Sequence, residues 1–322
     1  MDKRTIGVCI VTYNEEKYIA QAIESVLEQE CTAEVMVYVG NDASTDNTGI
    51  ICREYAQRFS KQVVLIDNPR NFGLVGNTKV VLERIQTDGC DYIAMLDGDD
   101  YWCDKYKLQK QLDYLESHED FGFVHTNQKL LFTDGTLKVE ARGGVREGDV
   151  FEWAGKRETA IANCTAFFRT SLLAYCNMQD FLDYQFKSMD YAMYIIFMRY
   201  TKFHFMEDFT AVWRRGHVSV SGGGNIEKQI AYLENGIQQW KYLGYLFPDK
   251  WPYTEENGNV FRKRSILKLA YKYGNYEIAH GVAHVSFPPT SFLEKVQRLC
   301  ASNKLLFSVL YNIHYKKKQK YR

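Results

Sequence analysis

The sequence predicts an α/β protein: a Rossmann-like, doubly wound and mostly parallel sheet, followed by a helical C-terminal extension. Short apolar runs alternate with segments of helical period through the first hundred residues, a pattern typical of parallel sheets built from βα units. Polar loops follow three of these runs, and in such a sheet those loops converge on one edge. The 322 residues are 46% hydrophobic and 25% charged, which fits one large globular domain and a smaller one.

Four strands are predicted in the first hundred residues. They are Ile6–Val11, Glu34–Val39, Val63–Ile66 and Tyr92–Leu96. The segments between them have helical spacing, and the predicted helices are Tyr18–Leu27, a helix carrying Ile50 to Phe59, and Thr78–Ile85. Because Tyr92–Leu96 is apolar throughout, we expect it to be a central strand that is covered on both faces.

The elements beyond residue 100 are less regular. We expect a helix at Lys105–His118, strands at Phe121–His125 and Lys129–Thr133 with an Asp-Gly hairpin turn, a mobile loop at Gly143–Gly148, a helix at Tyr184–Tyr200 and a strand at Phe203–Trp213. A glycine-rich tail then marks a boundary between domains 1–222 and 223–322. The second domain is predicted to be helical near Ile226–Phe247, Val260–Tyr273 and Phe292–Tyr315.

Three carboxylates follow the central strand within four positions: Asp97, Asp99 and Asp100. Carboxylates cannot be buried unpaired without a large desolvation cost, so a positive group is expected among them. A Mg²⁺ or Mn²⁺ ion carrying the phosphates of a nucleotide suits hard oxygen ligands at the carboxyl ends of parallel strands. The alternative is a solvated acidic turn that caps the helix after Asp104.

Charge and cysteine content limit the compartment and the partners. Forty basic residues balance forty acidic residues, so no global charge favours nucleic acid as a partner. The eight cysteines form no C-x-x-C pair. The start of the chain has no secretory apolar region, and no apolar stretch is long enough to span a bilayer. We therefore expect a cytoplasmic protein.

The C-terminus predicts a peripheral contact with a membrane. Apolar residues recur at helical spacing from Leu293 to Ile313, and the basic run Lys316–Arg322 follows them. Such a segment would bind anionic lipid at the inner face of a membrane. The alternative is a helix packed on the first domain with a solvated tail.

Several segments, in order, resemble the nucleotide-diphospho-sugar transferases of glycosyltransferase family 2, which have the GT-A fold. The opening strand and loop are Val8-Cys9-Ile10-Val11-Thr12-Tyr13-Asn14-Glu15-Glu16, and the second loop is Asn41-Asp42-Ala43-Ser44-Thr45-Asp46. Asp97-Gly98-Asp99-Asp100 is similar to the D-x-D motif of the family. Downstream, Met189-Asp190-Tyr191 and Trp213-Arg214-Arg215-Gly216-His217 resemble two further elements. Agreement of several motifs in order is much more specific than D-x-D alone.

The resemblance implies roles for individual residues. The residues that would bind the nucleotide-sugar are Thr12, Tyr13, Asn14, Asp42, Asn77, Asp97 and Gly98. Asp97 would lie on the ribose side. Asp99 and His217 would hold the metal, and Asp190 would be the catalytic base.

The resemblance also implies an activity. It is the inverting, metal-dependent transfer of a sugar from a nucleotide-diphospho-sugar to a hydroxyl of a glycan or lipid-linked acceptor, in assembly of a surface polysaccharide or glycolipid. A carboxylate must take the proton of the hydroxyl, and a cation must absorb the charge of the departing diphosphate. Two alternatives stay open: a sugar nucleotidyltransferase, whose first loop is usually glycine-rich and basic, and a non-catalytic sugar-nucleotide or glycan-binding protein.

Other roles remain open for some of these residues. Tyr13 could equally serve packing, and Asp46 is more simply explained as a cap of the next helix. Asp180 or Asp183 could supply the base in place of Asp190. The apolar neighbours of Asp190 predict a partly desolvated carboxylate with a raised pKa, while the dipole of its helix acts in the opposite direction.

Overall fold

The structure is a computed structural model that describes residues 3–139, 147–154, 161–215, 225–251, 253–283 and 288–316. The chain divides into two compact units, Met1–His217 and Val218–Arg322. The boundary that the sequence predicts after residue 222 falls within 216–224, outside the described residues. Most of the predicted loop Gly143–Gly148 also lies outside them, although Gly148 forms an isolated antiparallel bridge with Phe203.

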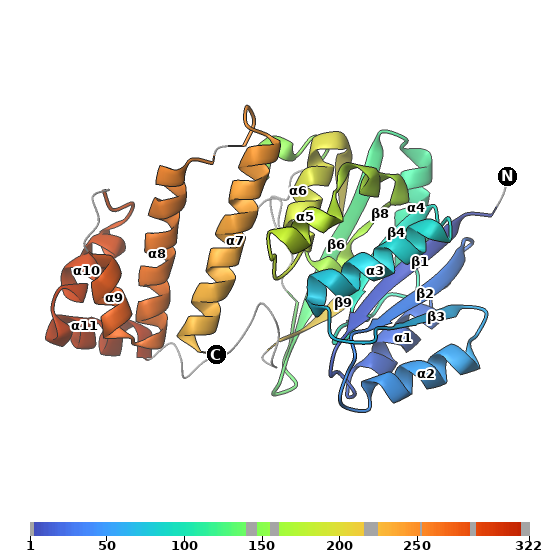
Figure 1. Cartoon of the computed structure of the whole chain (residues 1–322), viewed down its shortest axis with the longest axis horizontal. Helices are drawn as coiled ribbons and strands as arrows, with labels where there is room; N and C mark the ends of the chain where they lie inside the picture. The colour runs from blue at the N-terminus through green and yellow to red at the C-terminus, as the bar shows by residue number, and fades with distance from the viewer. Residues whose placement is uncertain are drawn as a thin grey trace. The chain divides into compact units, whose positions relative to one another are not determined.

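The first unit contains a sheet whose first half is parallel, as predicted (Figure 1). This half comprises β1 (Thr5–Thr12), β2 (Glu34–Asn41), β3 (Val63–Asp67) and β4 (Tyr92–Asp97). The register places Thr12 beside Asn41 and Val11 beside Asp97. The loops that follow β1, β2 and β4 therefore emerge together at one edge of the sheet.

The second half of the sheet is mixed. It comprises β5 (Tyr101–Trp102), β6 (Phe121–Phe132), β7 (Leu137–Val139), β8 (Phe167–Arg169) and β9 (Lys202–Arg215), in the order β3-β2-β1-β4-β8-β6-β9-β5 with β7 paired to β6. The separate strands predicted at Phe121–His125 and Lys129–Thr133 are one strand, because β6 stays paired with β9 through register shifts at Asn127. The predicted Asp-Gly turn joins β6 and β7, where Gly135 has a φ of 83°.

Helices cover both faces of this sheet. α1 (Ile19–Leu27), α2 (Thr48–Arg58) and α4 (Lys107–Ser117) form one core with alternate residues of β1. α3 (Gly73–Thr87) packs on the opposite face, where a Cβ at Gly7 would lie 2.5 Å from the side chain of Ile85. It begins earlier than the predicted Thr78, because the Asn71 side chain accepts the N–H of Gly73 in its first turn.

The helix predicted at Tyr184–Tyr200 is shorter and follows a separate turn of helix. α5 (Met178–Asp183) ends first, Gln185 then has a φ of 55°, and α6 (Asp190–Tyr200) begins after it. A residue in the left-handed region cannot continue a right-handed helix, so the prediction was wrong for residues 184–189. Asp190 consequently stands at the first position of α6. Short 3₁₀ segments at Phe151–Trp153, Asn163–Thr165 and Thr170–Tyr175 connect the remaining strands.

The second unit is helical, as predicted. Its helices are α7 (Ile226–Leu246), α8 (Glu255–Tyr273), α9 (Tyr276–Ala283), α10 (Phe292–Ala301) and α11 (Lys304–Leu310), followed by a π-helical segment at Tyr311–Lys316. Tyr271 and Phe307 lie at the centre of its core. The sequence did not predict α9. The single helix predicted at Phe292–Tyr315 is broken, because the Asn303 side chain accepts the N–H of Leu305 and starts a new helix.

Candidate functional site

The candidate site lies where β1, β2 and β4 end, and hydrogen bonds join the loops that follow the first two strands. The N–H of Asn14 donates to the Ser44 hydroxyl at 3.0 Å, and the Asn14 side-chain oxygen accepts the N–H of Thr45 at 2.8 Å. The N–H of Glu15 donates to the Thr48 hydroxyl at 2.7 Å. Asn14 makes these bonds with a φ of 57°, so it holds the first loop against the second.

Asp46 and Tyr13 lie next to this junction between the two loops, one bonded to the backbone and the other exposed to solvent. Asp46 caps α2, as predicted, because its carboxylate accepts the N–H of Thr48 at 2.9 Å. It also accepts the N–H of Glu16 at 3.2 Å, which joins the second loop to the first. Tyr13 has 44% of its surface exposed, so its ring is open to solvent and is not part of the core.

Asp42 is the centre of a buried polar network after β2. One carboxylate oxygen accepts the N–H of Phe72 at 2.8 Å and the side-chain amide of Asn68 at 3.1 Å. Asn68 also donates to Asn77 at 3.0 Å, and Asn77 donates to the carbonyl of Gly40 at 2.8 Å. The structure thus brings the predicted residues Asp42 and Asn77 together, with Asn77 supporting the loop that positions Asp42.

Glu15 reaches from the first loop to the D-x-D loop, which we define as Asp97–Asp100. Its carboxylate accepts the Thr12 hydroxyl at 2.8 Å. A Cβ at Gly98 would collide with this carboxylate, so the close approach requires glycine there. Burial and then the charge of Asp99 raise the pKa of Glu15 well above its usual range, against the hydrogen bond from Thr12.

Asp97, at the end of β4, shares an electrostatic cluster with Asp190. Burial, followed by the charges of Asp99 and Asp190, raises the pKa of Asp97 to about 7. The Asn163 side chain opposes this shift by donating to Asp97 Oδ1 at 2.9 Å, and the Tyr194 hydroxyl donates to Asn163 Oδ1 at 2.6 Å. Tyr194 lies one helical turn after Asp190 in α6, so a chain of hydrogen bonds connects the D-x-D loop to the helix that carries the predicted base.

Asp190 has the environment that its neighbours predict. Burial raises its pKa, while hydrogen bonds from the backbone of Tyr191 and the side chain of Ser188 lower it in part. The N-terminus of α6 favours the ionised form of Asp190, but desolvation favours the neutral form and has the larger effect.

Arg214 fixes the far end of the D-x-D loop. Its backbone N–H donates to Asp100 Oδ1 at 2.8 Å, and its guanidinium donates to the carbonyl of Asp99. The guanidinium carbon lies 4.8 Å from the ring centre of Tyr18 and 4.7 Å from that of Tyr101. These contacts are possible because β9 pairs with β5, which places the end of β9 beside the acidic loop.

The predicted metal ligands are only partly placed. Asp99 is half-buried within the acidic cluster, whereas His217 lies outside the described residues. Within the described ranges, no three His, Cys, Asp or Glu side chains form a group that could hold a metal ion.

The sequence profile of the family described as "Glycosyl transferase family 2" matches residues 7–175, which is more than half of the chain. The chain belongs to glycosyltransferase family 2. The matched range includes the first two loops, the D-x-D loop and Asn163, but it ends before Asp190.

Curated relatives of this family 2 protein match over shorter ranges. The putative teichuronic acid biosynthesis glycosyltransferase TuaG of Bacillus subtilis is 33% identical over 134 residues, which cover 42% of this chain and 50% of TuaG. The chain spans half or less of the length of the curated relatives it matches.

Solved structures show the same fold. The mannosyltransferase PcManGT from Pyrobaculum calidifontis, in complex with GDP-Man and Mn²⁺, aligns with a TM-score of 0.56 and 14% identity over 96% of this chain and 86% of that one. S. aureus TarS 1-349, in complex with UDP-GlcNAc, aligns with a TM-score of 0.52 and 15% identity over 98% of this chain and 92% of that one. The GT-A fold that the sequence predicts is confirmed.

Sequence reasoning missed three side chains of this family 2 site. Asn163 and Tyr194 gave no signal because their contacts depend on how distant segments meet. The sequence was misleading at Lys107, because a lysine in an amphipathic helix is normally predicted to be exposed. Here Lys107 is completely buried, donates to Gln111 Oε1 at 2.7 Å and lies 4.2 Å from the ring of Trp102, just after the D-x-D loop.

We expect Lys107 to make stability depend on pH. Burial lowers its pKa to about 7, whereas an unfolded lysine keeps its proton up to about pH 10. Between these values the unfolded state binds more protons, so the free energy of unfolding should rise with pH. Denaturant unfolding from about pH 7 to 10 should show wild type gaining stability relative to Lys107→Met. The exposed Lys105→Met is the matched control; an equal slope in wild type and Lys107→Met would refute the expectation.

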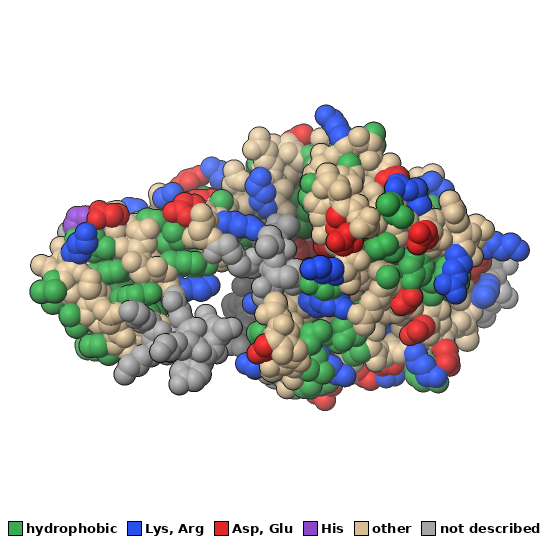
Figure 2. All heavy atoms as spheres, turned by 90° about the horizontal axis from the view of Figure 1, so that it is seen from below, with side chains coloured by type: hydrophobic (Ala, Val, Ile, Leu, Met, Phe, Trp, Pro, Cys, Tyr) green, Lys and Arg blue, Asp and Glu red, His purple; other side chains and the backbone are tan. Residues whose placement is uncertain are grey.

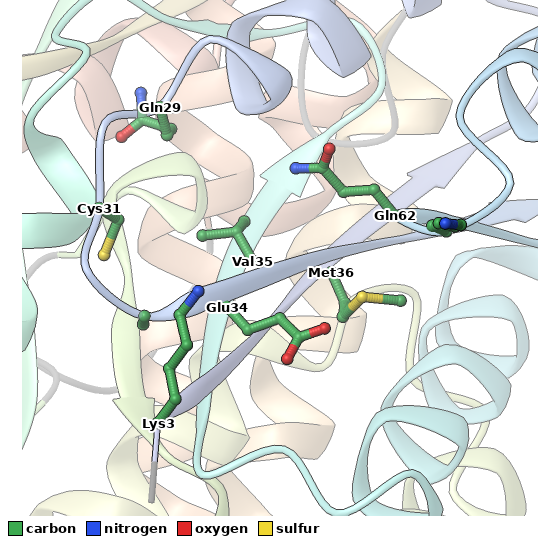
Figure 3. Close-up of a pocket in the computed structure, with 9 residues that line it drawn as sticks. Lys3, Gln29, Cys31, Glu34, Val35, Met36 and Gln62 are labelled. Atoms are coloured by element: carbon green, nitrogen blue, oxygen red, sulfur yellow. The ribbon is translucent and has the colours of Figure 1, made fainter.

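A separate pocket lies at the opposite end of the sheet (Figure 3). Glu34, Val35 and Met36 at the start of β2 line it, together with Lys3 and Gln62, which precede β1 and β3. It contains none of the predicted site residues, so the family motifs and this pocket occupy different ends of the strands.

Proposed function

We propose that this protein is an inverting glycosyltransferase that moves a sugar from a nucleotide-diphospho-sugar to a hydroxyl of a glycan or lipid-linked acceptor. The observation that carries the proposal is the chain of hydrogen bonds that runs from Asp97 through Asn163 to Tyr194, one helical turn after Asp190 in α6. The charges of Asp99 and Asp190 also raise the pKa of Asp97. A donor site and a proton acceptor are thus close enough to interact, as a single displacement at the anomeric carbon requires.

The residues present fit a divalent cation, Mn²⁺ or Mg²⁺, that arrives with the donor. Burial and mutual repulsion raise the pKa of Glu15, Asp97 and Asp100, so the negative charge of the cluster exceeds what Arg214 compensates. Mg²⁺ commonly binds through one or two carboxylates plus substrate phosphates, which agrees with Asp99 as a protein ligand and His217 as a second. When bound, the cation would neutralise charge on the departing diphosphate.

The loops after β1 and β2 would hold the base and ribose. Asp42 uses Oδ1 for Phe72 and Asn68, and we propose that Oδ2 accepts an N–H of the base while the exposed ring of Tyr13 covers it. Thr12, Asn14 and Gly98 would shape this binding site through their contacts with Glu15 and the second loop. Asp97 would accept a hydrogen bond from a ribose hydroxyl, and Asn163 would orient the Asp97 carboxylate for this contact.

The biological setting is also a proposal. Eight free thiols and no disulfide fit a reducing compartment such as the cytoplasm. The printed name of TuaG refers to teichuronic acid biosynthesis, and by analogy we propose a role in surface polysaccharide or glycolipid assembly.

A screen of nucleotide sugars tests this function. The protein is incubated with each donor and Mn²⁺, and free nucleoside diphosphate is measured with and without EDTA. We expect diphosphate release with at least one donor and loss of release in EDTA. Pyrophosphate exchange would instead indicate a sugar nucleotidyltransferase. If a donor binds but no nucleoside diphosphate is released, even when candidate acceptors are added, the protein would be a non-catalytic binding protein.

A further inference from the structure

α10 has its polar side buried in the second unit. Glu294 and Gln297 are almost fully buried. Glu294 accepts the Thr290 hydroxyl at 2.7 Å and the guanidinium of Arg264 at 3.1 Å, and it pairs with Arg298. Burial opposes ionisation of Glu294, but these hydrogen bonds outweigh it and hold its pKa to about 2. A charged network, together with Ala301 in the core and Cys300 packed against it, therefore attaches α10 to the unit.

The apolar side of α10 consequently faces outward. Phe292 is 82% exposed, Leu299 is 63% exposed, and Leu293 is exposed as well. This is the reverse of the usual arrangement, in which the apolar stripe of a surface helix faces the core.

α11 and the segment after it are apolar on both sides. Phe307 belongs to the core of the unit, and the partly buried Leu310 and Tyr311 pack against that core. On the other side Leu305 is 73% exposed and Ile313 is 67% exposed, and Leu306 and Val309 are exposed between them. A helix that is apolar all round is normally covered on every side. We therefore expect the outer side of α11 to be covered by a binding partner.

These exposed side chains come from two helices, α10 and α11, that are in contact with each other. Figure 2 shows hydrophobic side chains on the visible face of the second unit. We call the set the C-terminal apolar face; its members are Phe292, Leu293, Leu299, Leu305, Leu306, Val309 and Ile313.

After Glu294 the sequence carries charge of one sign. Residues 295–322 contain eight Lys or Arg and no Asp or Glu. Because the whole chain has forty of each, residues 1–294 carry 32 basic and 40 acidic residues. Lys295 and Lys304 are exposed on the two helices that carry the C-terminal apolar face, and the sequence after Glu294 adds only basic charge in a chain whose remainder is net negative.

We propose that the C-terminal apolar face docks on an anionic lipid bilayer and inserts its side chains at the interface. Apolar side chains flanked by lysine and arginine suit a surface that is negatively charged outside and apolar beneath. A second copy that met this face with its own would bring like charges together, which opposes pairing. No helix in the described ranges is long and apolar enough to cross a membrane, so the contact would lie along the surface. The proposal adds a partner to the transferase function without depending on it.

Vesicle co-sedimentation of the full-length protein tests this proposal. We expect binding to phosphatidylcholine vesicles that contain phosphatidylglycerol and much weaker binding to phosphatidylcholine alone. The double variant Leu305→Ser with Ile313→Ser should weaken vesicle binding at least tenfold, because it removes the transfer free energy of two apolar side chains from the bilayer contact. Lys295→Gln with Lys304→Gln should also weaken it about tenfold or more, since each basic residue near the surface contributes about 1 kcal/mol.

The matched control is Leu137→Ser with Val139→Ser, which removes two exposed apolar side chains from β7. It should bind vesicles like wild type. Unchanged thermal unfolding of each variant shows that the fold is retained. The proposal is overturned if wild type ignores anionic vesicles, if the Leu305 and Ile313 variant binds as wild type does, or if light scattering shows a dimer that this variant abolishes. Since no donor is present, none of these results bears on transfer.

Discussion

Asp190→Asn should lower the rate of sugar transfer by about 10² to 10⁴, the usual effect of removing a positioned general base. Donor affinity should stay nearly unchanged, because the substitution preserves the size of the side chain. The loops proposed to bind the donor follow β1, β2 and β4, whereas Asp190 lies on α6. Burial raises the pKa of Asp190, which moves its proton affinity towards the working pH, as a base requires. The measurement is kcat and KM for donor and acceptor in both proteins.

The pH profile adds a second readout. A base must be ionised to act, so the wild-type rate should rise with pH through the pKa of Asp190. The residual rate of Asp190→Asn should lose that limb. A residue that only stabilises α6 would lower the amount of active enzyme without removing the pH dependence.

Asp180 and Asp183 are the controls, since the sequence left both open as the base. Both lie on α5, where Asp180 accepts the side-chain amide of Asn177 at 2.7 Å and Asp183 accepts that of Gln179 at 2.9 Å. Neither charge contributes to the raised pKa of Asp97. We expect Asp180→Asn and Asp183→Asn to transfer sugar at close to the wild-type rate. A large loss in either of them, with Asp190→Asn within about threefold of wild type, would identify a different base.

Local patterns were sufficient to predict the parallel half of the sheet. β4 is apolar and buried from Tyr92 to Leu96 because both of its faces are covered, and it ends at Asp97, where the polar loop begins. The spacing of Ile19, Ala22, Ile23 and Val26 predicted α1, and all four side chains are buried. Since the carboxyl ends of parallel strands share one edge, the meeting of the first, second and D-x-D loops followed from topology.

Contacts between distant segments could not be predicted in this way. The bond from Asn163 to Asp97 depends on β8 pairing antiparallel with β4, and no spacing along the chain encodes that pairing. α10 misled pattern reasoning for a related reason: its apolar period predicts a helix but not which side faces inward. The buried partners of Glu294, which come from other segments, decide that orientation.

The metal dependence of donor binding rests on the charge of the D-x-D loop. Asp99 raises the pKa of Glu15, Asp97 and Asp100, which means that its own negative charge reaches all three carboxylates. A nucleoside diphosphate would add more negative charge at the same place. Phosphates and carboxylates repel one another, so a cation must lie between them before the donor can approach.

Asp99→Asn should therefore weaken binding of a nucleoside diphosphate at least tenfold in Mn²⁺, because a neutral amide is a poor ligand for a hard cation. In EDTA the same substitution should leave binding unchanged or slightly tighter, because it removes a charge that repels the phosphates. Calorimetric titration under both conditions measures the two affinities. Asp113→Asn, on α4, is the matched control and should behave like wild type in each. An equal loss in Mn²⁺ and in EDTA would mean that Asp99 shapes the loop and does not hold the cation.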